Sequence, residues 1–219
     1  MAVIRSFGKP DLFLTVTCNP KWEEIQNEII GVENSQKLTI IARVFNIKLK
    51  EILNDIFKKK IFGNVSAHMY VIEFQKRGLP HAHILIILCQ DSKPYNLDDF
   101  DSIVSAEIPD PILNPTTYAT VTKSMIHGPC GVLNPNSPCM IDGICSKQFP
   151  KKYCEATQSN DDGYPEYMRR ENRNSYKITT NKTTIEIDNR WVVPYNPYLT
   201  TKYNCHINCE ICSSVSVNK

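Results

Sequence analysis

Two histidines separated by one alanine are the clearest chemical feature of the sequence. They stand in "RGLPHAHILIIL" (77–88), at the start of an apolar run that is typical of a buried strand. Side chains at positions i and i+2 of a strand point to the same face, so His81 and His83 are expected to lie side by side. Two imidazoles in this arrangement can bind one divalent cation if a third ligand is near.

The segment before the histidines offers candidates for that third ligand. Residues 66–75 and 81–88 are predicted to be two strands joined by the connection "KRGLP", which makes a hairpin. Glu73 and Gln75 share one face of the first strand. An open site of imidazole with carboxylate or amide ligands suits Mg²⁺ or Mn²⁺ placed to polarise a phosphate. The alternative is that both histidines are half-buried strand residues whose hydrogen bonds are satisfied.

The segments around this hairpin predict an α+β fold. A mostly antiparallel central sheet with helices on one side is expected. Asn19 and Pro20 are predicted to start a helix, as N-cap and first helical residue. The other predicted elements are a strand at 11–18, a long helix from about 35 to 56, short helices within 96–108 and 115–128, a second hairpin at 176–188 and a strand at 206–212.

Nine cysteines are many for 219 residues, and their number is odd. Pro10 and Asp11 interrupt the apolar part of the first residues, so this segment is a poor match to a secretory signal peptide. We therefore expect reduced thiols and an intracellular protein. On a strand, Cys205 and Cys209 would share a face with Ile207 and Ile211, as core residues do.

A loop rich in cysteine, proline, asparagine and glycine, at about 127–165, has few apolar residues to order it. One tetrahedral zinc ion on three cysteines and a histidine would do so. The alternative is free thiols packed under the loop. The candidate ligands are His127, Cys130, Cys139, Cys145 and Cys154, of which the first two have the ligand-like spacing H-x₂-C.

The overall composition narrows the class of partner. The net charge is +2, with 42% hydrophobic and 22% charged residues, as in ordinary globular proteins. A nucleic acid would therefore have to be bound by local patches or through a metal, because no global basic field exists. No stretch approaches the roughly 20 apolar residues of a membrane span, so no membrane partner is expected.

Four segments together resemble the replication-initiator-like nicking domain of Helitron transposases. They are "FLTVTCNPKW" (13–22), "YVIEFQKRGLPHAHILI" (70–86), "MIHGPCG…SPCM…CSKQFPK" (125–151) and "WVVPYNPYLTTKYNCHIN" (191–208). The resemblance implies a single HUH endonuclease domain over residues 1–219, with the cysteine-rich loop as an insertion. It implies a core sheet like that of ferredoxin or of the RNA-recognition motif, with flanking helices.

The resemblance also implies a site and a partner. The metal would be Mg²⁺ or Mn²⁺ on His81 and His83, with Gln75 at the position of the third ligand and Glu73 as the second choice. The substrate would be single-stranded DNA in the nucleus, and a helicase domain follows in full-length family members. Basic residues beside the site could hold the DNA backbone, namely Lys76 and Arg77.

The family mechanism is a transesterification in which a tyrosine hydroxyl attacks a phosphodiester. The family carries its tyrosine pair in a helix after the block that matches "CHINCEICSSV", and no tyrosine follows Tyr203 here. We therefore expect a fragment or truncated copy without the catalytic helix, and whether it is an enzyme stays open. The alternative function is a non-catalytic, metal-stabilised DNA-binding or interaction module.

Other tyrosines are expected to be packing residues instead of nucleophiles. Pro194 and Pro197 argue against a regular helix around the candidates Tyr195, Tyr198 and Tyr203. Two further tyrosines, Tyr164 and Tyr167, lie in the polar loop.

Overall fold

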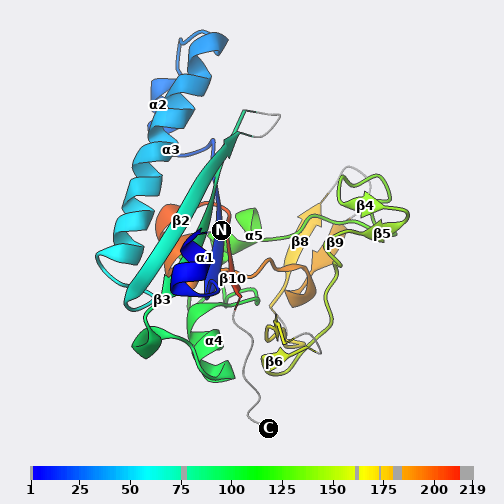
Figure 1. Cartoon of the computed structure of the whole chain (residues 1–219). Coiled ribbons are helices and arrows are strands. Elements are labelled where there is room, and N and C mark those ends of the chain that lie inside the picture. The colour runs from blue at the N-terminus through cyan, green and yellow to red at the C-terminus, as the bar shows by residue number, and fades with distance from the viewer. Residues whose placement is uncertain (1, 75–77, 161–162, 173, 180–183, 213–219) are drawn as a thin grey trace.

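The computed structural model of the chain describes residues 2–74, 78–160, 163–172, 174–179 and 184–212 (Figure 1). Its centre is a four-stranded sheet with the strand order β10-β1-β3-β2, in which every neighbouring pair is antiparallel. The predicted α+β fold with an antiparallel central sheet is thereby confirmed. The strands are β1 (Leu12–Thr17), β2 (Val65–Phe74), β3 (Pro80–Leu88) and β10 (Ile207–Ile211).

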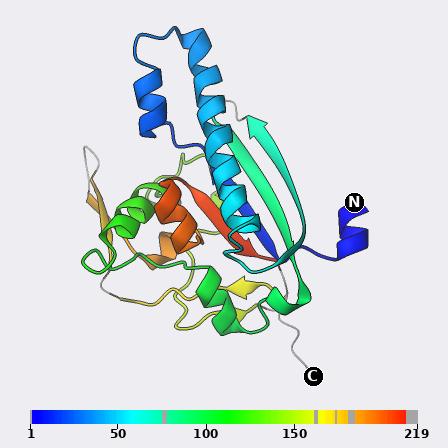
Figure 2. The same ribbon diagram turned by 90° about the vertical axis from the view of Figure 1, so that its left-hand side faces the viewer.

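One face of this sheet carries the main hydrophobic core. Alternate residues of β1, β3 and β10 are fully buried and pack against the long helix α3 (Asn34–Phe57), which crosses this face of the sheet (Figure 2). The period of two in each strand sends the intervening residues to the opposite face. The buried set includes Leu14, Val16, Ala82, Ile84, Ile207 and Cys209 from the sheet and Phe45, Leu49 and Ile52 from α3.

In the described part of the chain, five shorter helices and two 3-10 turns surround the sheet. The predicted helix at Asn19 begins later, at Glu23: the Asn19 side-chain oxygen accepts from the Lys21 N–H at 2.9 Å, which forms a turn before the helix. None of the helices in the described part of the chain is long and apolar enough to cross a membrane. The elements are α1 (Ala2–Phe7), α2 (Glu23–Glu28), η1 (Gln90–Ser92), α4 (Leu97–Ile103), α5 (Pro115–Ser124), η2 (Asn189–Trp191) and α6 (Pro197–Tyr203).

Helix α6 corrects the expectation that prolines exclude a helix near residue 197. Pro197 occupies the first helical turn, where the missing N–H has no intrahelical partner to lose. The side chain of Asn196 caps the helix by accepting a hydrogen bond from the backbone N–H of Leu199 at 3.0 Å. The helix therefore includes Tyr198 and Tyr203.

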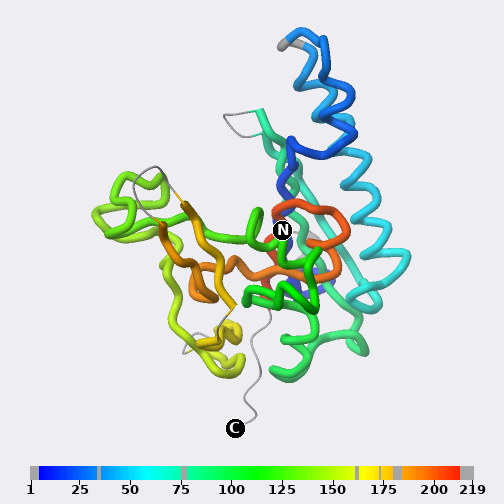
Figure 3. Tube along the Cα trace, turned by 180° about the vertical axis from the view of Figure 1, so that it is seen from behind, coloured from blue at the N-terminus to red at the C-terminus, as the bar shows by residue number. Residues whose placement is uncertain are grey.

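The segment between α5 and α6 forms a lobe on the side of the sheet away from α3 (Figures 1 and 3). It is built from two-stranded ladders, and the predicted hairpin at 176–188 is confirmed as one of them. A small core of Cys130, Cys145, Ile187 and Trp191 lies inside it. The strands are β4 (Met140–Ile141), β5 (Ile144–Cys145), β6 (Gln158–Ser159), β7 (Pro165–Glu166), β8 (Tyr176–Thr179) and β9 (Thr184–Ile187).

A buried carboxylate joins α3 to α6. The Asp55 side chain is 1% exposed and accepts a hydrogen bond from the Tyr203 hydroxyl at 2.7 Å. Burial would raise the pKa of Asp55, but its contacts with Lys202, Lys59 and Tyr203 outweigh burial and lower the pKa to about 2. The carboxylate is therefore charged at neutral pH and depends on these partners for its stability.

We expect Tyr203→Phe to lower the free energy of unfolding by about 1.5–3 kcal/mol, because it removes a hydrogen bond to a buried charge. Tyr198→Phe is the matched control: that side chain is 45% exposed and its hydroxyl lies 3.3 Å from the same carboxylate, so a loss below about 0.5 kcal/mol is expected. Urea unfolding followed by tryptophan fluorescence measures both. Equal losses in the two variants would contradict the assigned role of Asp55.

Candidate metal centres

The sheet face away from α3 carries the two histidines of the H-x-H pair. In the strand register, His81 pairs with Thr17 on β1 and with Glu73 on β2, while His83 pairs with Thr15 on β1. Because directly paired residues point to the same side of a sheet, these five side chains share one face. We call this surface the histidine face.

Threonines on β1 orient both imidazoles. The Nδ1 atom of His81 lies 3.1 Å from the hydroxyl of Thr17, and the Nδ1 atom of His83 lies 3.2 Å from the hydroxyl of Thr15. A hydrogen bond at Nδ1 fixes the ring and leaves Nε2 for another partner, which is the usual arrangement of metal-binding histidines. The ring of His83 also stacks on Phe13, with 5.9 Å between the centroids.

Glu73 is the described carboxylate that contacts the histidine pair. Its Oε2 lies 3.4 Å from Nε2 of His83, and its side chain is 65% exposed. The other sequence-predicted residues of this site, Gln75, Lys76 and Arg77, lie outside the described residues. A cation on the histidine face would draw the ligand atoms of Glu73, His81 and His83 closer by side-chain rotation, because these described atoms do not all lie within 4.8 Å of one another.

A third histidine, which sequence reasoning missed, lies near the pair. Burial lowers the pKa of His81, and the charges of His206 and His83 lower it further, while Glu73 opposes them. His206 stands just before β10, where the polar residues His206, Asn208 and Glu210 alternate with buried neighbours. In the sequence, this alternation of polar and apolar residues was the signal that could have placed His206 on the same face as the pair. The cysteines of the same segment, Cys205 and Cys209, are buried in the core, as expected.

The hydroxyls of Tyr195, Tyr198 and Tyr203 have partners away from the histidine face. Tyr195 is buried, donates to the Glu107 carbonyl at 2.9 Å, and has its pKa raised to about 12, chiefly by burial. Tyr198 and Tyr203 contact Asp55 of α3, so the sheet lies between them and the histidine face. Tyr167 is buried and Tyr164 is exposed.

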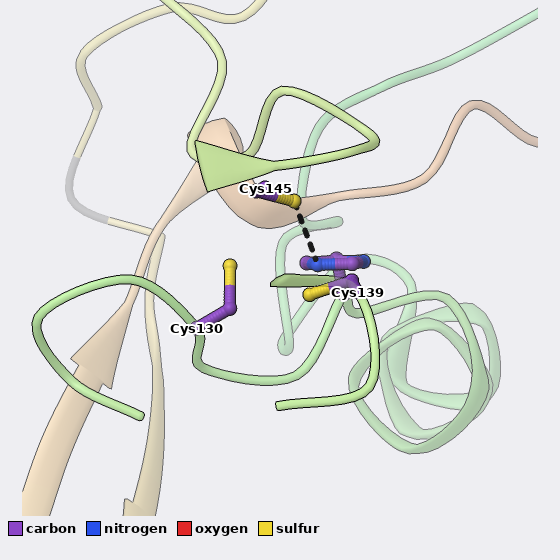
Figure 4. Close-up of side chains that lie close together, drawn as sticks. Cys130, Cys139 and Cys145 are labelled. Carbon is purple, nitrogen blue, oxygen red and sulfur yellow. Dashed lines mark hydrogen bonds between the residues drawn. The ribbon is translucent and has the colours of Figure 1, made fainter. Parts of the chain in front are cut away.

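A second group of potential ligands forms in the cysteine-rich lobe. The ligand atoms of His127, Cys130, Cys139 and Cys145 all lie within 4.8 Å of one another, and the three sulfur atoms face a common space (Figure 4). Sγ of Cys145 lies 3.6 Å from Nε2 of His127. Tetrahedral zinc, with Zn–S near 2.3 Å and Zn–N near 2.0–2.1 Å, would separate its ligand atoms by about 3.6–3.8 Å. We call this group the cysteine cluster.

Aromatic packing and a short hairpin hold the cysteine cluster in place. The His127 ring stacks on Phe149 at 4.2 Å and on Trp191 at 6.5 Å between centroids. Cys139 and Cys145 flank the turn that joins β4 to β5, and the Ser146 N–H donates to the Cys139 carbonyl at 2.8 Å. The ligands are therefore positioned by packing that does not involve the ion.

The electrostatics of the cysteine cluster favour a cation. Burial raises the pKa of the Cys130 thiol to about 12, and the nearby sulfurs of Cys145 and Cys139 add to the rise. Burial also lowers the pKa of His127, helped by Lys151 and Lys147, so the ring is neutral and can act as a ligand. Adjacent thiolates repel one another unless a metal ion neutralises them, so a divalent cation such as zinc fits this donor set.

Cys154, the fifth candidate ligand, is not part of the cysteine cluster. Its Sγ donates to the Ala156 carbonyl at 2.7 Å, and its backbone pairs with Arg169 away from the cluster. The remaining three cysteines and one histidine are the number that a closed tetrahedral site needs.

Comparison with known families supports the resemblance seen in the sequence. Residues 1–86 match the model of a family described as "Helitron helicase-like domain at N-terminus". The matched region includes β1, α3, β2 and most of β3, and so both histidines of the H-x-H pair. The match supports a Helitron-related role. No curated protein matches the chain.

We expect the purified protein to contain about one equivalent of zinc, because the cysteine cluster offers one tetrahedral site. Cys145→Ser should remove most of this zinc, whereas Cys154→Ser should retain it, since Cys154 lies apart. Elemental analysis by mass spectrometry gives the stoichiometry. A wild-type protein with less than about a tenth of an equivalent of zinc, and with all nine thiols titrating freely, would contradict the assignment.

Proposed function

Because residues 1–86 match the Helitron helicase-like domain, we propose that this chain is a metal-dependent, single-stranded DNA nicking domain of the Helitron type. The observation that carries the proposal is the pair of oriented imidazoles on the histidine face. His81 and His83 each have Nδ1 held by a threonine, and Nε2 of His83 lies 3.4 Å from the Glu73 carboxylate, so an ion bound there would also meet this carboxylate. The family match adds that this pair belongs to a Helitron-related segment.

The divalent cation, Mg²⁺ or Mn²⁺, would be held by His81 and His83 together with an oxygen ligand from the β2 hairpin. Glu73 is the described candidate, and Gln75 remains the choice that the family resemblance favours. When bound, the cation supplies Lewis-acid stabilisation of charge on a phosphate. The threonines of β1 keep the rings oriented, so the cost of ordering the ligands is met during folding.

Contacts to DNA would come from the surroundings of the histidine face. Phe13 and Leu85 are paired in register and continue this face beyond His83. Aromatic rings at such positions can stack with unpaired bases, which favours single strands over duplex. Lys76 and Arg77, in the connection before β3, remain the proposed phosphate contacts.

Strand transfer would require a hydroxyl held in line with the phosphorus atom. The described hydroxyls of Tyr195 and Tyr203 are buried in other contacts, and that of Tyr198 lies on the α3 side of the sheet. This observation favours the second candidate function, a non-catalytic DNA-binding module that keeps the same metal face. We therefore expect binding without a covalent adduct from this chain alone.

We expect Mn²⁺ to strengthen the binding of a labelled single-stranded oligonucleotide, measured by fluorescence anisotropy. The double variant His81→Ala, His83→Ala should lose at least tenfold of the Mn²⁺-dependent affinity, because both nitrogen ligands are removed. His68→Ala is the control, since His68 is an exposed β2 residue that stacks on Phe57. Affinity that is the same with and without Mn²⁺, in wild type and double variant alike, would sink the proposal.

A denaturing gel of the same mixture separates nicking from binding. A band that survives denaturant and disappears in Tyr198→Phe would show that Tyr198 is the nucleophile and that the module function is wrong. Binding that persists unchanged as salt is raised would contradict phosphate contacts, because these weaken steeply with salt.

Mn²⁺ affinity should also depend on pH in a defined direction. Protons compete with the metal for imidazole lone pairs, so affinity falls when pH drops through the pKa of the ligand. Burial, together with His206 and His83, lowers the pKa of His81, so its ring stays neutral below the ordinary value near 6.5. Calorimetry should therefore show constant affinity above about pH 7 and a decline only below about pH 6.5. A decline in Mn²⁺ affinity centred at or above about pH 7 would contradict the lowered pKa of His81.

A further inference from the structure

His206 shares the histidine face with the H-x-H pair. The Thr17 N–H donates to the His206 carbonyl at 2.9 Å, and the adjacent residues Val16 and Ile207 are paired in register. His206 therefore lies beside Thr17 on β1, and His81 lies beside Thr17 on the other side. Glu73 follows beyond His81, which gives one row across all four strands.

The protonation of the His206 ring is set by its neighbour. Its Nδ1 lies 2.8 Å from the backbone carbonyl of Ser124, on α5. A carbonyl oxygen can only accept, so Nδ1 carries the proton and the neutral ring has its lone pair on Nε2. His206 thus has its Nδ1 engaged, as His81 and His83 do, and its Nε2 lone pair is available to a ligand.

A second acceptor lies next to His206 on the same side of β10. Asn208 pairs with Thr15 in register, and its side-chain oxygen is buried without a hydrogen-bond partner among the described residues. A buried polar atom without a partner is costly and calls for an explanation. Both offered atoms, an imidazole lone pair and an amide oxygen, are acceptors. They therefore fit a cation and would repel an anion.

Distances across the sheet allow one ion to bind His206, beside β10, together with the histidines of β3. Neighbouring strands are about 4.8 Å apart, so the Cα atoms of His206 and His81 are roughly 10 Å apart. With a metal–nitrogen bond near 2.1 Å, an ion bound through Nε2 lies up to about 6.5 Å from the Cα atom of its histidine. An ion above Thr17 can therefore be shared. Glu73 is a further strand away, roughly 14 Å from His206, so His206 and Glu73 cannot both bind that ion.

We propose that His206 completes the cation site of His81 and His83 from the β10 side, with the Asn208 oxygen as an adjacent donor. The inference rests on the proposed function and changes its ligand set, because the third ligand then comes from β10 instead of the β2 hairpin. Three imidazoles also alter the choice of metal: nitrogen-rich sites favour Mn²⁺ or later transition metals over Mg²⁺, which prefers oxygen.

Pulsed electron paramagnetic resonance of the Mn²⁺-loaded full chain tests the ligand set without using activity. Couplings to nitrogen nuclei count the imidazoles bound to the ion, and three are expected in the wild type. His206→Ala should show two and bind Mn²⁺ at least tenfold more weakly by calorimetry. The control His68→Ala should stay within about twofold of the wild type.

Two coordinated imidazoles in the wild type, with Glu73→Ala as the weakened variant, would overturn the inference and leave the proposed function standing. No binding of Mn²⁺ by the wild type would defeat both. The nitrogen count of the wild type decides the question even where His206→Ala does not fold, since it needs no variant. Preferential binding of Mg²⁺ over Mn²⁺ would also count against three imidazole ligands.

Discussion

The period-two alternation of three antiparallel strands is the constraint on which the rest of this structure depends. On β1, β3 and β10, every second residue is apolar and packs against α3, which excludes water from that face. The intervening positions are thereby committed to the opposite face, where threonine and histidine occupy β1 and β3. A shift of one residue in register would bury the imidazoles and expose the core, so folding and ligand placement are enforced together. The histidine face is therefore positioned by the same strand register that forms the core behind it.

The cysteine-rich lobe cannot be ordered by a large hydrophobic core. It has little apolar surface, and its ladders are only two to four residues long. Stacking of His127 between Phe149 and Trp191 supplies part of the order, and one metal ion on the cysteine cluster would supply the rest. The two candidate centres differ in chemistry: thiolate-rich ligands would suit a structural ion, whereas open imidazole ligands would suit an ion that also meets a phosphate.

Local patterns were enough to predict the β2–β3 hairpin, the long helix, the second hairpin and the shared face of His81 and His83. Four of the five predicted zinc ligands come together, because they lie close in sequence and on one lobe. His206 was not predicted, since its place beside His81 depends on the pairing of β10 with β1, residues almost two hundred positions apart. The prediction that Pro197 excludes a helix was wrong for a local reason. Proline disrupts the interior of a helix but is tolerated in its first turn, where Pro197 lies.

The central claim is that the histidine face holds a divalent cation by His81 and His83. A crystal of the protein soaked in Mn²⁺, with diffraction recorded at the manganese absorption edge, tests it most directly. We predict one anomalous peak above β1 and β3, about 2.2 Å from Nε2 of each histidine. Anomalous density confined to the cysteine cluster, or none within bonding distance of His81 and His83, would contradict it.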